Sequence, residues 1–376
     1  MRVLIAVAHG GIYSGGSHQA FYLLRGLKRA GIEVMAVWGP DEEDDPHGFD
    51  GLKQLDIPYE IIPINRGVTL DSLGKFRNVL KRFKPDVVEC FKSGAQYHAL
   101  YGGLGLNDHA LVFYRGISRP MDIWQGLKYR LWRVDRIIAN SQALKRTMIE
   151  TGGIPMDKID CVYNEYDPAC ADPELVNADD LKAELSIPPD VPLITQLGNW
   201  SEWRGQTVTL AAAKMLVARG LKFHLLFAGR ETEKLRPKVD ELRLGGVVTL
   251  SPYRRDPERV LKITDIAVNA STSHESLSGG LVNAQAMGVP AVASDLAGNP
   301  EVVEDGVTGF IVPTNNPVSL ADGLAKMLEM PQEKLKDMGC KARERARAFF
   351  SSEVRIKSTL DVYERAIAQC KGRLKL

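Results

Sequence analysis

Short runs of branched apolar residues alternate with helix-like segments along the chain, and this alternation occurs twice. The first block starts with the strand-like run RVLIAVA at 2–8, passes through a glycine-rich loop into an amphipathic segment at 19–31, and returns to a strand-like run at 32–39. Such alternation predicts a parallel sheet with helices on both faces, because a connection between parallel strands has to cross over the sheet. We therefore expect doubly wound α/β structure.

The alternation restarts at PLITQLGNW, residues 192–200, after a stretch rich in proline and acidic residues. A chain of 376 residues is long enough to bury two cores. We predict Rossmann-like domains at 1–168 and 191–350, a linker at 169–190, and a C-terminal helix at 351–376 that packs back on the N-terminal domain. Open α/β sheets bind ligands beyond the carboxyl ends of their strands, so we expect a ligand site in a cleft between the domains.

The composition is that of an ordinary globular protein, with 44% hydrophobic residues, 25% charged residues and a formal charge of +1. A nucleic acid partner is not expected, because it would require a strongly basic surface. No apolar run approaches the roughly 18 residues that span a bilayer. The five cysteines are scattered and lack CxxC spacing, so we expect reduced thiols, a cytoplasmic location and no structural zinc.

Five segments of the chain, in this order, resemble family 4 of the retaining glycosyltransferases (glycosyl transferases group 1), which have the GT-B fold: residues 15–34, 134–149, 162–167, 197–216 and 274–313. The resemblance implies a hexosyltransferase-type enzyme that moves a sugar from a nucleotide sugar, such as a UDP- or GDP-sugar, to a hydroxyl of a carbohydrate or lipid-linked acceptor. It implies a role in polysaccharide, lipopolysaccharide or glycolipid assembly. It implies no metal and no cofactor beyond the nucleotide-sugar co-substrate.

The segment GNWSEWRG matches the place where the family grips the donor diphosphate with an arginine and a lysine. Arg204 stands at the lysine position and keeps the charge, with a fork suited to phosphate. Asn199 stands at the arginine position, and its loss of charge predicts weaker donor binding unless another group replaces it. Arg230, directly after the run LLFAG, is the candidate substitute.

The segment HESLSGGLVN matches the family's two glutamates spaced eight residues apart. Glu275 is the first and is expected to face the donor sugar, whereas the second is replaced by Asn283, a weaker partner for the nucleotide ribose. Ser278, Gly279 and Gly280 lie between them and would place helix N-terminal amides at the phosphate or the sugar hydroxyls.

Two loops complete the predicted donor site. Gly15 and Gly16 open the first helix and are candidates for the diphosphate or the acceptor; a plain strand-to-helix turn is the alternative. Tyr253 and Arg254 are expected beside the nucleotide base, with an ordinary surface loop as the alternative.

Arg115 follows the strand-like run ALVFY, where many relatives carry a histidine. An arginine cannot act as a general base, so we expect an electrostatic role or acceptor recognition. The predicted catalytic set is therefore Glu275, Arg204 and Arg115. Glu89 and Lys92 end the run PDVVECFK, and each is a candidate to assist the acceptor hydroxyl or, alternatively, part of a solvated loop.

The acidic run 41–45 could attract a metal, but such runs are usually just solvated. The basic segments 75–85 and 127–136 could contact an anionic membrane surface peripherally, or they are helix faces whose charges extend into water.

Two other functions fit the same sequence. One is a sugar-nucleotide-binding protein with weak or no transfer activity, which the departures at Asn199 and Asn283 favour. The other is a sugar-nucleotide epimerase, which would need no acceptor. A dinucleotide-dependent oxidoreductase is disfavoured, because neither glycine loop has a full GxGxxG pattern followed by an acidic residue.

Overall fold

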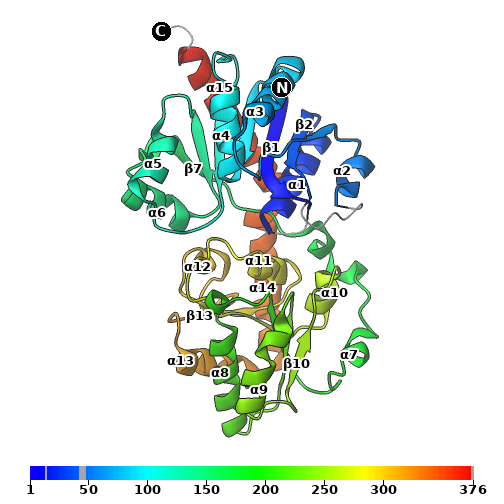
Figure 1. Cartoon of the computed structure of the whole chain (residues 1–376). Coiled ribbons are helices and arrows are strands. Elements are labelled where there is room, and N and C mark those ends of the chain that lie inside the picture. The colour runs from blue at the N-terminus through cyan, green and yellow to red at the C-terminus, as the bar shows by residue number, and fades with distance from the viewer. Residues whose placement is uncertain (13–14, 42–47, 374–376) are drawn as a thin grey trace. The chain divides into compact units, whose positions relative to one another are not determined.

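A computed structural model describes residues 1–12, 15–41 and 48–373, and the chain divides into two compact units (Figure 1). The first unit combines Met1–Glu165 with Ser352–Leu376, and the second is Tyr166–Ser351. Each unit is a doubly wound parallel α/β domain.

The sheet of the first unit has seven parallel strands in the order β3-β2-β1-β4-β5-β6-β7. The predicted strand runs all form, and the structure adds the three-residue edge strand β3 that the sequence patterns missed. The strands are β1 (Arg2–Gly10), β2 (Glu33–Gly39), β3 (Tyr59–Ile61), β4 (Val87–Phe91), β5 (Ala110–Arg115), β6 (Arg136–Ala139) and β7 (Ile159–Cys161).

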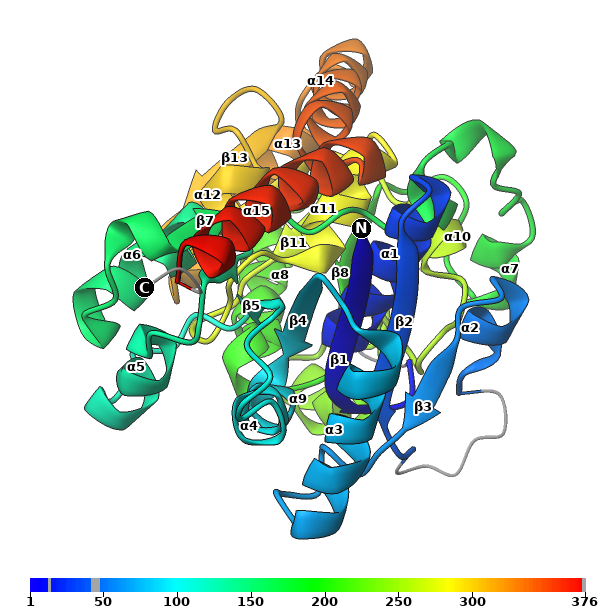
Figure 2. The same cartoon turned by 90° about the horizontal axis from the view of Figure 1, so that it is seen from above.

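Helices cover both faces of this sheet, which is why its strands are apolar throughout rather than alternating. Val3, Ile5 and Val7 of β1 pack into the core beneath α1 and α15, and the intervening side chains pack into a second core beneath α3 to α6. The C-terminal helix α15 contacts α1, β4 and β5 (Figure 2). The helices are α1 (Gly15–Arg29), α2 (Asp50–Gln54), α3 (Leu70–Phe83), α4 (Lys92–Gly102), α5 (Ile123–Arg130), α6 (Gln142–Gly152), η1 (Met156–Lys158) and α15 (Ser352–Arg373).

Local signals explain several helix ends. Thr69 and Ser72 form a reciprocal capping box at the start of α3. Ser141 accepts a hydrogen bond from the Leu144 amide at the start of α6, and Gly153 ends that helix in the left-handed conformation, with φ of 58°.

The sheet of the second unit has six parallel strands in the order β10-β9-β8-β11-β12-β13. The strands are β8 (Leu193–Leu197), β9 (His224–Ala228), β10 (Val248–Ser251), β11 (Ile266–Asn269), β12 (Ala291–Ser294) and β13 (Gly309–Val312). The helices are η4 (Glu202–Arg204), α8 (Gln206–Ala218), η5 (Thr232–Leu235), α9 (Arg236–Glu241), α10 (Pro257–Lys262), α11 (Gly279–Ala286), α12 (Asn299–Val302), α13 (Pro317–Leu328) and α14 (Gln332–Phe350).

The residues expected to form a linker belong to the second unit. They form three short helices, η2 (Pro168–Cys170), η3 (Pro173–Leu175) and α7 (Leu181–Glu184). Leu181 and Ile187 pack in a core cluster with Val260 of α10, and Lys262 donates a hydrogen bond to the Pro173 carbonyl at 2.9 Å. No helix in the described part of the chain is long and apolar enough to cross a membrane.

Candidate functional site

The strand order of the second sheet reverses between β8 and β11, the two central strands. In open α/β sheets, ligands bind at such a switch point, beyond the carboxyl ends of the strands. The loops that follow β8 and β11 carry Arg204 and Glu275. The structure therefore brings these two predicted residues together at the place where a ligand is expected.

The loop after β8 is closely packed and hydrogen-bonded along its backbone. Gly205 has φ of 67°, and a Cβ atom there would lie 1.8 Å from the Ala270 carbonyl oxygen, so a larger residue does not fit. Gln196 donates a hydrogen bond to the Arg204 carbonyl at 2.8 Å, and Gln206 donates to two further carbonyls of the loop. These contacts fix the backbone from which the Arg204 side chain extends.

The Arg204 guanidinium lies over the Trp203 ring, 4.5 Å from its centroid, and its Nη1 is 4.0 Å from Oε2 of Glu275. The arginine side chain remains 31% exposed. Stacking on the ring orients the planar fork, so that its N–H donors are available to an anion.

Glu275 is a buried carboxylate, with 8% of the residue exposed. Its Oε2 accepts hydrogen bonds from Ser271 Oγ at 3.1 Å and Asn269 Nδ2 at 3.3 Å, and its Oε1 accepts from the Ser276 amide at 3.4 Å. The preceding residue, His274, has φ of 58°, which is uncommon for a side-chain-bearing residue and typical of strain at functional sites. The carboxylate is thus held in one orientation.

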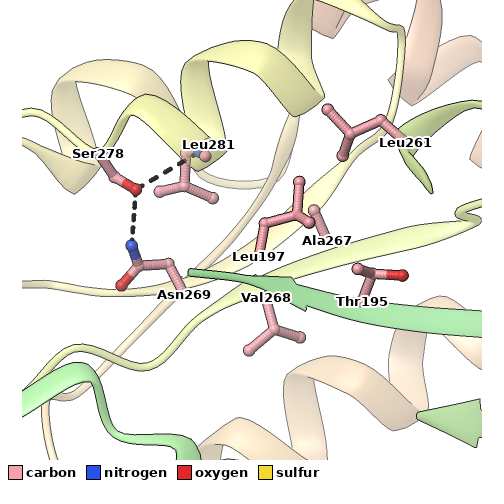
Figure 3. A pocket seen from close by; sticks show the side chains of 9 residues that line it. Thr195, Leu197, Leu261, Ala267, Val268, Asn269, Ser278 and Leu281 are labelled. Atoms are coloured by element: carbon pink, nitrogen blue, oxygen red, sulfur yellow. Dashed lines mark hydrogen bonds between the residues drawn. The ribbon is translucent and has the colours of Figure 1, made fainter. Parts of the chain in front are cut away.

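The first turn of α11 borders the same site. Ser278 Oγ accepts hydrogen bonds from the Leu281 amide at 3.4 Å and from Asn269 Nδ2 at 2.7 Å (Figure 3). A Cβ atom on Gly279 would meet nothing within 4 Å, so the space over this turn is open. Amides at a helix N-terminus favour phosphate or hydroxyl oxygens. A small pocket lies alongside, lined by Thr195, Leu197, Leu261, Ala267, Val268, Asn269, Ser278, Gly280 and Leu281.

A network of four polar residues that the sequence analysis missed supports Glu275. Asn269 Oδ1 accepts from the Ser271 amide, Ser294 Oγ donates to the Ser271 carbonyl, and Asn299 Nδ2 donates to Ser294. Asn269 and Ser294 are the last residues of β11 and β12. The signal was present in the sequence, since a polar residue ends each of these two apolar runs at the carboxyl edge of the sheet.

Asn199 and Arg230 are also neighbours. Asn199 Oδ1 accepts a hydrogen bond from the Arg230 amide at 3.0 Å, so this asparagine holds the backbone that carries Arg230. The Arg230 guanidinium lies 5.1 Å from the ring centroid of Tyr253, which is 41% exposed. The loops after β8, β9 and β10 are joined by these contacts.

Arg254 is bound by carboxylates. It forms two parallel hydrogen bonds with Asp256 at 2.8 Å and one with Glu184 at 2.5 Å. These hydrogen bonds raise the pKa of Arg254 above its ordinary value. The Arg254 guanidinium is therefore held in place by Asp256 and Glu184, two acidic residues of the second unit.

Asn283 lies on α11, and its Oδ1 accepts a hydrogen bond from the Asp167 amide at 2.8 Å. Asp167 in turn caps η2 through the Ala169 amide at 3.0 Å. Asn283 thus anchors the start of the second unit to this helix.

Other predicted residues lie in the first unit. Gly15 and Gly16 begin α1; a Cβ on Gly15 would meet nothing within 4 Å, and one on Gly16 would lie 3.0 Å from His9 Nε2. Arg115 ends β5, and its Nη2 donates to the Arg119 carbonyl at 3.0 Å.

The expectation for Glu89 was wrong. This residue is 1% exposed, lies within β4 and accepts a hydrogen bond from the Tyr363 hydroxyl of α15. Burial raises the pKa of the Glu89 carboxyl to about 7. It opens neither to a cleft nor to solvent, because the C-terminal helix covers the strand. Lys92 is exposed at the start of α4.

No group of three or more His, Cys, Asp or Glu side chains in the described residues could hold a metal ion. Of the acidic run 41–45, only Asp41 is described, and residues 42–45 lie outside the described residues.

Two doubly wound parallel sheets in one chain, with a cation and a fixed carboxylate at a switch point, define the GT-B class of glycosyltransferase folds. The family model described as "Glycosyltransferase Family 4" matches residues 13–169, and that described as "Glycosyl transferases group 1" matches residues 177–345. The chain belongs to this family of glycosyltransferases.

Solved structures have the same fold. A glycosyltransferase from Rickettsia africae superposes with a TM-score of 0.85 at 18% identity, covering 97% of this chain and 98% of that one. HepE of Anabaena in complex with UDP superposes with a TM-score of 0.81 at 18% identity, covering 96% and 99%. Both superpositions confirm the predicted fold.

Curated relatives differ in how much of their own length the match covers. A D-inositol 3-phosphate glycosyltransferase of Nocardia farcinica is 29% identical over 66% of this chain and 56% of its own length. A lipopolysaccharide core biosynthesis glycosyltransferase, LpsE of Rhizobium meliloti, is 24% identical over 84% and 85%. The chain spans about half the length of the first relatives it matches, 56%, 43% and 47% of them.

Proposed function

We propose that the protein is a retaining glycosyltransferase of hexosyltransferase type, which moves a sugar from a nucleoside diphosphate sugar to a hydroxyl acceptor. The observation that carries the proposal is the placement of Arg204 and Glu275, 4.0 Å apart, beside the open first turn of α11. A cation, a fixed carboxylate and helix amides at one switch point suit a diphosphate joined to a sugar.

Each of these groups has a distinct role. Arg204 and the amides of Ser278, Gly279 and Gly280 take the diphosphate, and they stabilise the charge that develops as it leaves. Glu275 accepts a hydrogen bond from a hydroxyl of the donor sugar and so orients the reacting carbon. Its three protein donors hold the carboxylate in place.

In the transfer step, the bond between the sugar's anomeric carbon and the diphosphate oxygen breaks, and its electron pair leaves with the diphosphate. The acceptor oxygen forms a bond to the same carbon from the face that the nucleotide leaves, which retains the configuration. The acceptor proton passes to the departing diphosphate, and Arg115 is assigned to the acceptor side of the reaction as an electrostatic group.

We assign the remaining contacts with the nucleotide sugar to residues in the loops after β9 and β10, on α11 and at the start of α1. Arg230, whose backbone Asn199 holds, supplies the second cation for the diphosphate. Tyr253 stacks on the base, with Arg254 behind it. Asn283 keeps an amide nitrogen for a ribose hydroxyl, while its oxygen holds Asp167. Gly15 and Gly16 are assigned to the diphosphate or the acceptor.

We place the reaction in polysaccharide, lipopolysaccharide or glycolipid assembly, because the relative LpsE is named for lipopolysaccharide core biosynthesis. We also propose that it takes place at the cytoplasmic side of a membrane. Contact with the membrane would come from exposed apolar residues around α5, where Trp124 is 77% exposed, Trp132 65% and Leu127 48%. Two of the basic residues of this segment, Lys128 and Arg133, are buried and so contribute little to such contact.

Titration calorimetry against UDP-, GDP-, ADP- and dTDP-sugars tests the donor site, and UDP-glucose is the first candidate because HepE is also described with it. Arg204→Ala should weaken donor binding about ten- to a hundredfold, since it removes a charged hydrogen bond. Glu275→Gln should bind the donor but lower kcat about a hundredfold, since it disturbs orientation of the sugar.

Arg219→Ala is the matched control, because Arg219 forms an exposed pair with Asp322 at 2.7 Å in the same unit. Absence of donor binding by the unmodified protein would overturn the proposal. Binding without transfer to any acceptor would favour a sugar-nucleotide-binding protein. Interconversion of two donor sugars without an acceptor would favour an epimerase.

A further inference from the structure

A buried lysine, Lys128, lies at the carboxyl edge of the first sheet. Lys128 of α5 is 8% exposed, and its Nζ donates to Ser93 Oγ at 2.8 Å and lies 5.0 Å from the ring centroids of Tyr97 and Tyr129. Within the described residues, no acidic side chain forms an ion pair with it. Burying a cation without a counter-ion is costly, and a buried charged group with a shifted pKa is a candidate for ligand binding.

A second cation, Arg115, lies close enough to Lys128 to disfavour the protonated form of the lysine. Arg115 and burial together lower the pKa of Lys128 to about 8, with burial the larger cause. Among the residues that the structure describes, the Arg115 side chain has one hydrogen bond, to the Arg119 carbonyl, and its buried Nε has no partner. No carboxylate in the described part of the chain pairs with Arg115 either. Two neighbouring cations without an acid form a site that an anion would complete.

The backbone around these side chains favours the same ligand. The first sheet reverses its order between β1 and β4, and α4 starts directly after β4. Its first residue, Lys92, has φ of 68°, and no side chain of the described residues caps its N-terminus. Ser93 is exposed, so the group that holds Lys128 is open to solvent. The amides of this turn add donors for an anion.

We propose that Lys128, Arg115 and Ser93 form an anion subsite that binds a phosphate group of the acceptor. This inference rests on the proposed transferase function and deepens it, since it assigns the acceptor to the class of phosphate esters. Lys128 and Arg115 neutralise the phosphate, Ser93 donates a hydrogen bond to it, and the adjacent hydroxyl of the acceptor is positioned for transfer. A soluble sugar or polyol phosphate and a lipid-linked phosphate carry the same group.

Thermal unfolding in phosphate, compared with chloride at equal ionic strength, tests the subsite without activity. The background is Arg204→Ala, so that binding at the proposed donor site does not contribute. Phosphate should raise the melting temperature by about 2–4 °C. Lys128→Met should remove this rise, and Lys128→Arg should keep it. Lys158→Met is the matched control, because Lys158 donates to the Leu131 carbonyl at 2.8 Å before β7, at the opposite edge of the sheet.

Glycerol 3-phosphate in solution and phosphatidic acid in phosphatidylcholine vesicles distinguish the two sources. Binding of either probe that Lys128→Met abolishes supports the subsite, and the tighter probe identifies the source. The proposed subsite would be overturned if the Lys128→Met variant and the protein that keeps Lys128 responded equally. It would also be overturned if neither responded to phosphate, glycerol 3-phosphate or phosphatidic acid. Failure of donor binding through Arg204 would instead affect the proposed function, because that measurement uses a different site and a different variant.

Discussion

The Tyr363 hydroxyl of the C-terminal helix donates a hydrogen bond to Oε2 of Glu89, a residue at the centre of the first sheet and 274 positions earlier in the chain. Arg355 of the same helix donates to the carbonyl and the side-chain oxygen of Gln19, and lies 3.6 Å from Glu165. These buried polar contacts fix α15 in register on the sheet, since apolar packing alone would tolerate a shift.

Glu89 should make stability depend on pH. Burial raises the folded pKa of its carboxyl from 4.5 to about 7, so its stabilising contribution is complete below pH 4.5 and is lost as pH rises through about 7. Glu89→Gln keeps an acceptor for Tyr363 and cannot ionise. The variant should gain up to about 3 kcal/mol over the unmodified protein between pH 4.5 and pH 8.

Urea denaturation at both pH values measures this difference. Glu333→Gln, at an exposed position on α14, is the control for a general effect of charge. An unchanged difference between Glu89→Gln and the unmodified protein across this range would contradict a raised pKa.

Gly205 should be intolerant of substitution. Its φ of 67° and the 1.8 Å approach of a Cβ to the Ala270 carbonyl require the loop to move in Gly205→Ala, and this should cost about 2–4 kcal/mol. Gly220 has φ of 74° with nothing within 4 Å, so Gly220→Ala should cost only about 1 kcal/mol. Equal losses in the two variants, measured by chemical denaturation, would argue against a fixed loop.

The strands were predictable because parallel strands buried on both faces must be apolar throughout, and such runs stand out in the sequence. The strand β3 was missed because it has three residues, lies at the edge of the sheet and is partly exposed. Short edge strands bury little and leave little pattern.

The candidate site was predictable only in part. Arg204 and Glu275 stand in segments whose order and spacing carry a resemblance. Asn269 and Trp203, which hold them, have no such signature, because their role arises from contacts made only in the folded sheet. The positions of Glu89 and Lys128 depended on tertiary packing, which covers the first with α15 and places the second between two rings.

Asn283 has two separable roles, and two variants distinguish them. Asn283→Asp keeps the oxygen that accepts from the Asp167 amide but loses the amide nitrogen assigned to the ribose. It should retain stability and weaken donor binding. Asn283→Ala loses both and should also lower the free energy of unfolding by about 1 kcal/mol. Calorimetry and denaturation measure the two effects. Unchanged donor affinity in both variants would limit Asn283 to a structural role.

The anion subsite should weaken as pH rises through about 8, because Lys128 binds phosphate only when protonated and burial lowers its pKa to that value. The groups that face it are Arg115, the Ser93 hydroxyl and the rings of Tyr97 and Tyr129. Lys128→Arg keeps its charge to far higher pH. In the Arg204→Ala background, stabilisation by phosphate should therefore fall between pH 7 and pH 9 with Lys128 and stay nearly constant with Lys128→Arg. Parallel pH profiles for the two variants would show that another group controls the response.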